Sequence, residues 1–207
     1  MYLRGSIIHE AQKLFSLNGY LSTGVNEIIE AAGTSKGGFY NHFASKEDLF
    51  LEVLAEAQKI WRNRVLHGIN DIESPTEKII QILRNYCDRY LKDEENFPGG
   101  CIFITFSVEL DDTRPHLVKE VYKGFEGFKT LLKSLLDEAI EKGELPDDLD
   151  SKTVTGMLFT GMLGASVLFG VNKSISTLDC SINSLIEYLH ILSGKEVINH
   201  SRYFQTR

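Results

Sequence analysis

A short segment near the N-terminus combines side chains that bind phosphates with side chains that can contact base edges. Within residues 23–46 (TGVNEIIEAAGTSKGGFYNHFASK), the exposed face of an expected short helix offers Lys36, Tyr40, Asn41 and His42. Lysine and tyrosine suit phosphate oxygens, whereas asparagine and histidine can hydrogen-bond to base edges in a major groove. The segment therefore has the chemistry of a surface that recognises double-stranded DNA.

Two consecutive glycines lie in the same expected helix. Gly37 and Gly38 each cost roughly 1 kcal/mol relative to alanine in a helix interior, so stability alone does not favour them. Small residues near a helix N-terminus let the backbone approach a phosphate or a groove closely. The glycine pair thus favours a contact surface over a purely structural helix.

The residues around this segment predict two short helices joined by a tight turn. Thr23 is expected to cap a helix with apolar residues at Val25 and Ile28. Gly33 ends that helix, and Ser35 caps the next one. Two short helices joined in this way form a helix-turn-helix.

This part of the chain resembles the TetR/AcrR family of transcriptional regulators, strongly over about residues 5–55 and in general layout beyond them. The matching residues are Phe15, Gly19, Tyr20, Val25, Ile28, Ala31–Gly33, Ser35–Phe43 and Ser45–Leu49. The resemblance implies a homodimer whose last two helices form a four-helix interface. It also implies a divergent helical ligand-binding domain after the helix-turn-helix.

The resemblance assigns DNA contacts residue by residue. The positions are Asn26, Ser35, Lys36, Gly37, Gly38, Tyr40, Asn41, His42 and Lys46. Tyr40 and Lys46 would each hold a phosphate. Thr34 and Ile29 depart from the family pattern in ways that concern packing of the turn, and Gly38 lacks a side chain often found there.

Bulk charge gives the DNA-binding expectation no support. The formal net charge is −7, and residues 1–49 contain four Lys or Arg against five Asp or Glu. A nucleic-acid-binding domain is often basic. The expectation therefore rests on local pattern.

Apolar residues recur at three and four along most of the chain, which predicts an all-α protein of about nine helices. We expect a helix-turn-helix domain over residues 1–48, a ligand-binding and dimerisation domain over 49–194, and a tail over 195–207. Residues 101–110 have strand propensity but no partner strand, so a short buried helix is expected there. Asp112 is expected to cap the next helix, with Pro115 in its first turn.

Aromatic side chains crowd the middle helices, as they would around an apolar pocket or in a plain core. The residues expected at a small-molecule pocket are Trp61, Tyr86, Tyr90, Cys101, Phe106, Tyr122, Phe125 and Phe159. The effector cannot be identified from the sequence, and no cofactor is expected.

The three cysteines, Cys87, Cys101 and Cys180, are far apart and show no C-x-x-C spacing, which fits a reducing cytoplasm without disulfides or zinc. Cys101 follows two glycines, and some TetR/AcrR members sense electrophiles through a cysteine in a similar context. A buried inert thiol is the favoured alternative. Glu109, with its acidic neighbours and a histidine, suggests helix capping and solvation more than a metal site, so no metal is expected.

Residues 153–172 contain no charge and are long enough to span a membrane. Their threonines, glycines and unbiased flanks favour a buried dimerisation helix instead, so no membrane contact is expected. The residues expected at the dimer interface are Met157, Thr160, Gly161, Gly164, Leu168, Ile182, Leu185, Ile186 and Leu189.

Together these patterns predict a ligand-responsive DNA-binding regulator in the cytoplasm. A homodimer would place two recognition helices about 34–36 Å apart on a near-palindromic operator. A small molecule would release it by shifting the helix that contains residues 49–61. A repressor that senses electrophiles through Cys101 and a helical scaffold without DNA affinity remain alternatives. No catalytic constellation indicates an enzyme, and repression is not distinguished from activation.

Overall fold

The computed structural model describes residues 2–110 and 113–194, which form helices joined by turns and loops, with no strand within those ranges. The all-α prediction is confirmed. The helices are α1 (Leu3–Asn18), α2 (Val25–Ala31), α3 (Lys36–Tyr40), α4 (Lys46–Val65), η1 (Ile69–Asp71), α5 (Pro75–Asn85), η2 (Tyr86–Leu91), α6 (Ile102–Leu110), α7 (Pro115–Glu141), α8 (Ser151–Asn172) and α9 (Ile175–Leu192). The expected cap Asp112 and the tail 195–207 lie outside the described residues.

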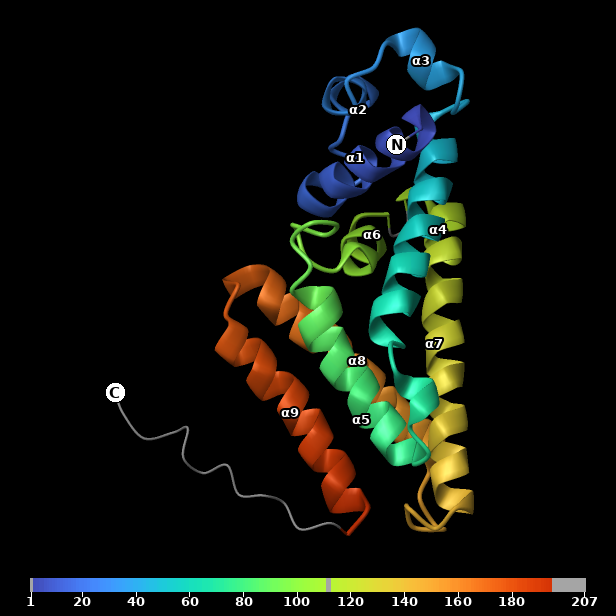
Figure 1. The fold of residues 1–207 in the computed structure, drawn as a ribbon, viewed down its shortest axis with the longest axis vertical. Helices are drawn as coiled ribbons and strands as arrows, with labels where there is room; N and C mark the ends of the chain where they lie inside the picture. Colours follow the sequence, from blue (N-terminus) through green and yellow to red (C-terminus); the bar gives the residue numbers. More distant parts are fainter. Residues whose placement is uncertain (1, 111–112, 195–207) are drawn as a thin grey trace, which may run out of the picture.

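The helices form two regions joined by long helices (Figure 1). Helices α1, α2 and α3 gather at one end, and α5, α8 and α9 pack together at the other. Helices α4 and α7 contact each other along the long axis between them. Helix α6 lies at the junction, where it contacts α1, α7 and α8.

Helix α4 connects the two regions directly. The Ser45 hydroxyl accepts a hydrogen bond from the Asp48 backbone N–H at 3.0 Å, and Glu47 and Asp48 lie in the first turn, where carboxylates favour the helix N-terminus. The helix has 20 residues and is therefore about 30 Å long at 1.5 Å per residue. It begins at the turn after α3 and ends beside α5.

Several expected boundaries change. Gly24, not Thr23, is the N-cap of α2, because the Thr23 hydroxyl donates instead to the Gly19 carbonyl at 2.7 Å. The helix expected over residues 75–91 ends as an α-helix at Asn85 and continues as the π-helical η2. The expectation of a helix over residues 101–110 is confirmed by α6.

The aromatic ring of Phe106 joins α6 to the N-terminal helices. It lies 4.7 Å from the ring of Phe50 on α4 and 6.2 Å from that of Phe15 on α1, all between ring centroids. All three side chains are fully buried. Such contacts are worth roughly 0.5–1.5 kcal/mol per pair beyond area burial, so they fix α6 against α1 and α4.

A carboxylate at the end of α6 adds a polar link to the same region. Glu109 accepts hydrogen bonds from the backbone N–H groups of Tyr20 at 2.5 Å and Leu21 at 2.8 Å. Those residues follow the end of α1, where Gly19 adopts a φ of 84°. Glu109 thereby satisfies two backbone donors in the α1–α2 connection.

The loop before α6 lies directly on the backbone of α1. A β-carbon at Gly99 would overlap the Ser16 carbonyl oxygen, so only glycine fits this approach. The Gly99 N–H donates to the Ser16 hydroxyl at 3.0 Å, and the Gln12 amide donates to the Asn96 carbonyl at 3.3 Å. The main chain of the loop therefore holds α1 through hydrogen bonds with the side chains of Ser16 and Gln12.

We predict opposite effects of alanine at two glycines. Gly99→Ala should lower the free energy of unfolding by about 1–3 kcal/mol, as other overpacking substitutions do, because the loop must move away from Ser16. Gly127→Ala is the control: a β-carbon there meets nothing within 4 Å, and in mid-helix alanine should stabilise by roughly 0.5–1 kcal/mol. Urea unfolding followed by circular dichroism measures both; a neutral Gly99→Ala would contradict the close contact.

Candidate functional site

Helices α2 and α3 meet in a short turn at the far end of the molecule. The Ser35 hydroxyl caps α3 by accepting from the Gly38 N–H at 3.0 Å. Phe39 and Phe43 are buried with their rings 5.7 Å apart, which anchors α3 from beneath. The residues between and beside these two anchors therefore point outward.

The predicted DNA-contact residues share this outer surface. Those that are exposed are Asn26, Ser35, Lys36, Gly37, Tyr40, Asn41 and His42, and those that are half-buried are Gly38 and Lys46. A β-carbon at Gly38 would overlap the Thr34 hydroxyl, so the missing side chain at Gly38 fits the presence of Thr34. The amine of Lys36 has no ion-pair partner among the described residues. This surface can offer a cation, a phenol, an amide and an imidazole to a ligand.

Lys46 is turned more toward the protein than the sequence suggests. Its Nζ lies 4.4 Å from the centroid of the Tyr20 ring and donates to the Leu21 carbonyl at 3.4 Å. Desolvation lowers the pKa of Lys46, with a further decrease from Arg114, although Glu109 opposes the change. A phosphate contact would require this side chain to swing outward.

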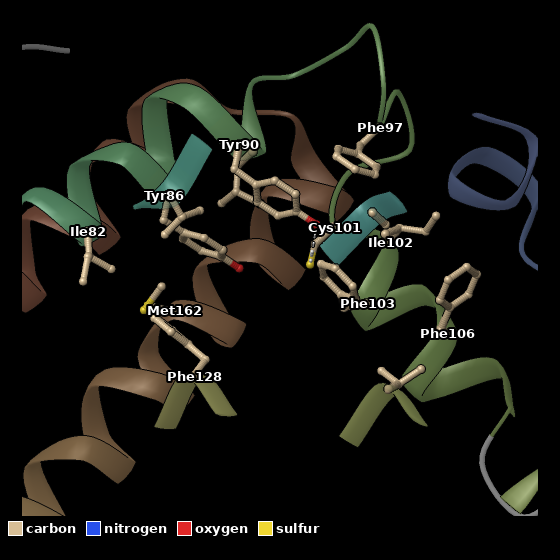
Figure 2. Close-up of a cluster of buried hydrophobic side chains, with 14 of the residues drawn as sticks. Ile82, Tyr86, Tyr90, Phe97, Cys101, Ile102, Phe103, Phe106, Phe128 and Met162 are labelled. Carbon is tan, nitrogen blue, oxygen red and sulfur yellow. Dashed lines mark hydrogen bonds between the residues drawn. The ribbon is translucent and has the colours of Figure 1, made fainter. Parts of the chain in front are cut away.

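A cavity of about 220 Å³ lies among α4, η2, α6, α7 and α8. Figure 2 shows Tyr86, Cys101, Phe103, Phe128 and Met162 around its interior. Of the residues expected at a pocket, those that line the cavity are Trp61, Tyr86, Cys101, Phe125 and Phe159. Its wall is predominantly aromatic and aliphatic, as in sites for small organic molecules.

Three other residues expected at the pocket lie elsewhere. Phe106 belongs to the core between α1, α4 and α6. Figure 2 shows it farther from Tyr86 and Met162 than Phe103, which precedes it on α6. Tyr122 falls on the outer face of α7 and is 55% exposed. Tyr90 is buried behind the cavity, stacked on Tyr86 at 5.6 Å.

Sequence reasoning missed the polar rim of the cavity. The rim residues are Gln58, Arg62 and Lys123, and Gly124 lines the same part of the cavity. Gln58 and Arg62 are four residues apart on α4 and flank Trp61. Their spacing of four residues on an expected helix places them on one face, so the sequence does contain a signal for this polar rim.

The polar groups inside the cavity are neutral. Tyr86 and Ser166 share a hydrogen bond between their hydroxyls, and burial raises the pKa of Tyr86 well above that of an ordinary tyrosine. Burial likewise raises the pKa of the Cys101 thiol, which accepts a hydrogen bond from the Tyr90 hydroxyl at 3.5 Å. Hydrogen bonds to the sulfur offset this only in part. Cys101 is thus a buried thiol, not a thiolate.

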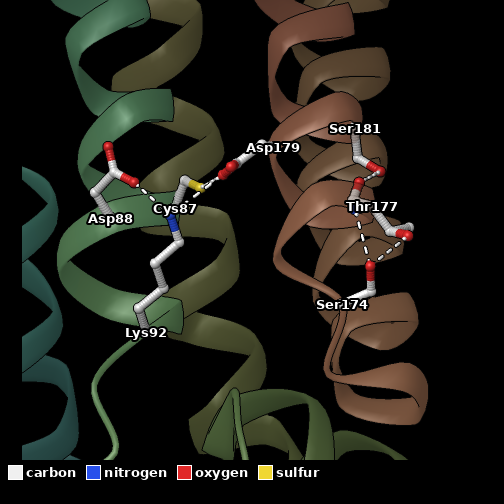
Figure 3. A network of polar contacts seen from close by, with 7 residues as sticks. All are labelled: Cys87, Asp88, Lys92, Ser174, Thr177, Asp179 and Ser181. Atoms are coloured by element: carbon white, nitrogen blue, oxygen red, sulfur yellow. Dashed lines mark hydrogen bonds and ion pairs between the residues drawn. The ribbon is translucent and has the colours of Figure 1, made fainter. Parts of the chain in front are cut away.

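A separate polar cluster joins η2 to α9 (Figure 3). Possible metal-ligand atoms of Cys87, Asp88 and Asp179 lie within 4.8 Å of one another. Lys92 places its amine 2.7 Å from the Asp88 carboxylate and 3.2 Å from that of Asp179. Burial raises the pKa of Cys87 to about 12, so its thiol stays protonated. Lys92 therefore supplies the cation between the two carboxylates. These contacts join the end of η2 to α9.

The predicted dimer face divides between the interior and the surface of the subunit. Residues that α9 turns inward are Ile182, Leu185, Ile186 and Leu189, which are buried because this face packs on α5 and α8. Gly161 also faces inward, since a β-carbon there would meet the Leu185 side chain at 2.6 Å. The four α9 side chains are therefore buried within the subunit, and Gly161 is partly buried. The other residues predicted at the dimer interface are exposed on α8: Met157, Thr160, Gly164 and Leu168.

Helix α8 is long and apolar enough to cross a membrane, by length and composition only. In the structure it packs against α7 and α9 as one layer of the helical bundle. Length and composition alone are weak evidence for a membrane span, because core helices of soluble proteins meet the same test.

Comparison with known proteins matches this architecture along nearly the whole chain. Residues 7–53 match the family model for bacterial regulatory proteins of the tetR family, and residues 75–185 match the tetracyclin repressor-like C-terminal domain. The repressor DhaR of a Mycobacterium species is 26% identical over 96% of this chain and 98% of its own.

Two solved structures have the same fold. A TetR regulator from Chloroflexus aurantiacus has a TM-score of 0.83 and 28% identity, covering 90% of this chain and 93% of that one. FadR from Bacillus subtilis, solved in complex with stearoyl-CoA, has a TM-score of 0.75 and 23% identity, covering 93% and 99%. The chain belongs to the TetR family of ligand-responsive, DNA-binding transcriptional regulators.

Proposed function

We propose that this protein is a cytoplasmic homodimeric repressor that binds a near-palindromic operator and is released when a small molecule fills the cavity. It acts by binding and not as an enzyme. The observation that carries the proposal is the position of α4, which begins at Lys46 beside the DNA-binding surface and lines the cavity at Trp61. A ligand that displaces α4 changes the placement of α3 at the same time.

The outer surface of α2 and α3 supports the DNA-binding part of the proposal. The N-terminus of α3 is exposed at Lys36, where a cation and free backbone N–H groups can meet a phosphate. Tyr40, Asn41 and His42 follow on the same exposed side. A second subunit would present the same surface to the next major groove.

We predict that Lys36→Ala lowers affinity for operator and for random DNA alike. One lost phosphate contact should flatten the slope of log K against log salt by about 0.9. Fluorescence anisotropy with a labelled upstream DNA fragment over a salt series measures the slope. Lys59→Ala is the matched control, because this lysine is exposed on α4 and pairs with Glu56 at 3.3 Å. Equal slopes for Lys36→Ala and the wild type would contradict the phosphate role, and no DNA binding at low salt would favour the scaffold alternative.

The exposed apolar side chains around the α8–α9 turn support dimerisation there. Val171 is 82% exposed, Ile175 55% and Leu168 50%. A stable monomer rarely leaves such a patch in water. We propose that this surface, together with Met157, Thr160 and Gly164, forms the interface in place of the buried α9 residues.

We predict that Leu168→Glu converts the dimer to a monomer, because the interface would then bury an unpaired charge. Light scattering after size-exclusion chromatography measures the mass. Val108→Glu is the control: Val108 is equally apolar and 75% exposed, but lies on α6 away from this surface. A Leu168→Glu protein that remains dimeric would move the interface elsewhere.

The cavity supports a small organic effector, and the stearoyl-CoA bound by FadR supports the same role for this fold. Electrophile sensing through Cys101 is less well supported. A sensor cysteine needs a lowered pKa and solvent access, whereas Cys101 is buried and its pKa is raised.

A further inference from the structure

A second space, which the proposed function leaves unused, adjoins the cavity. A groove of about 560 Å³ runs between α4 and α7. The cavity and the groove share four residues: Gln58, Arg62, Lys123 and Gly124. The cavity alone is smaller than the roughly 300–1,000 Å³ of ordinary ligand sites, whereas cavity and groove together fall within that range.

The two spaces differ in chemistry. No Asp or Glu from the described residues lines the cavity, whose inner wall is made of rings, aliphatic chains and the neutral groups of Tyr86 and Cys101. The groove is lined by aliphatic side chains, including Leu51, Leu54 and Leu117. It also has charged and polar side chains from both helices, including Glu47, His116 and Glu120. A ligand that fills both needs an apolar part and a polar part.

In the described part of the chain, contacts within the groove give its other ionisable side chains partners and leave the guanidinium of Arg62 without one. His116 Nε2 lies 2.9 Å from the Glu47 carboxylate, and Lys123 Nζ lies 2.7 Å from that of Glu120. Arg62 lies where the two spaces meet, and its guanidinium has no hydrogen-bond or ion-pair partner among the described residues. Its guanidinium can bind a carboxylate, sulfonate or phosphate through two parallel hydrogen bonds.

We infer that the effector is an amphipathic anion whose apolar part fills the cavity, whose acidic group binds Arg62, and whose remaining polar part lies in the groove between α4 and α7. The inference rests on the proposed function for the role of the cavity and adds the chemistry of the ligand. Because the groove reaches Glu47 in the first turn of α4, its occupant would separate α4 from α7 next to the DNA-binding helices.

The test uses two dyes that differ in a single charged group. The first is 8-anilinonaphthalene-1-sulfonate, and the second is its neutral counterpart N-phenyl-1-naphthylamine. Fluorescence titration of the full chain should show tighter binding of the sulfonate. Arg62→Gln should weaken the sulfonate about tenfold, which is the lower range for a hydrogen bond to a charged group, and leave the neutral dye unchanged.

Two further variants locate the dyes. Arg84→Gln removes an exposed arginine on α5 that lines neither space and should change neither affinity. Gly124→Leu adds a side chain where the two spaces meet, with only the end of the flexible Gln58 side chain nearby at 3.2 Å, and should weaken both dyes. Circular dichroism confirms that each variant is folded.

Equal affinity for the two dyes, or sulfonate binding that Arg62→Gln leaves intact, would overturn the inference. Unchanged binding to Gly124→Leu would overturn it as well, because the dyes would then lie outside the cavity. Gel-shift assays without dye test the proposed function separately. A protein that binds the sulfonate through Arg62 but never binds its upstream DNA would keep the inference and contradict the repressor role.

Discussion

The packing of Phe106 between Phe15 and Phe50 is the contact that fixes the N-terminal helices against α6. It joins three helices that belong to different parts of the chain, and all three rings are fully buried. Gly99 before α6 and Glu109 near its end hold the same α1 region through hydrogen bonds to Ser16, Tyr20 and Leu21. Helix α1 and the α1–α2 connection are therefore held against α6 and the loop that precedes it.

The same short helix borders the cavity. Cys101 and Phe103, at its start, line the cavity, while Phe106 and Glu109 lie one to two turns further on. Helix α4 makes a second connection, from Lys46 to the cavity wall at Trp61 and Arg62. A ligand in the cavity would thus contact two rigid elements that both lead to α1–α3. Because packed helices shift as units, a displacement at the cavity would reach the DNA-binding surface without a flexible hinge.

Local signals made the N-terminal region predictable from sequence. Ser35 caps α3 as expected, Ser45 caps α4 in the same way, and Gly19 and Gly33 follow α1 and α2 with positive φ. These features depend on neighbours within four residues. The all-α fold followed from periodicity in the same way, including the helix over residues 101–110.

Contacts between distant residues were beyond the sequence. An aromatic residue at helical spacing can face a cavity, the core or solvent, and Trp61, Phe106 and Tyr122 do these three different things. The residues of α9 that were expected at a dimer interface are buried within the subunit, because an apolar helix face can pack against its own chain or against a partner. Glu109 binds backbone groups about 90 residues away, so no local pattern reveals it.

Hydrogen exchange at the α1–α2 connection tests the central claim most directly. The claim is that a ligand in the cavity acts on the DNA-binding helices through α4 and α6. With 8-anilinonaphthalene-1-sulfonate bound, amide exchange at Tyr20 and Leu21 should become faster, because movement of α6 weakens their hydrogen bonds to Glu109. Peptides from the end of α9 serve as the internal reference and should not change. Altered exchange confined to the helices that line the cavity, with Tyr20 and Leu21 unaffected, would contradict the account.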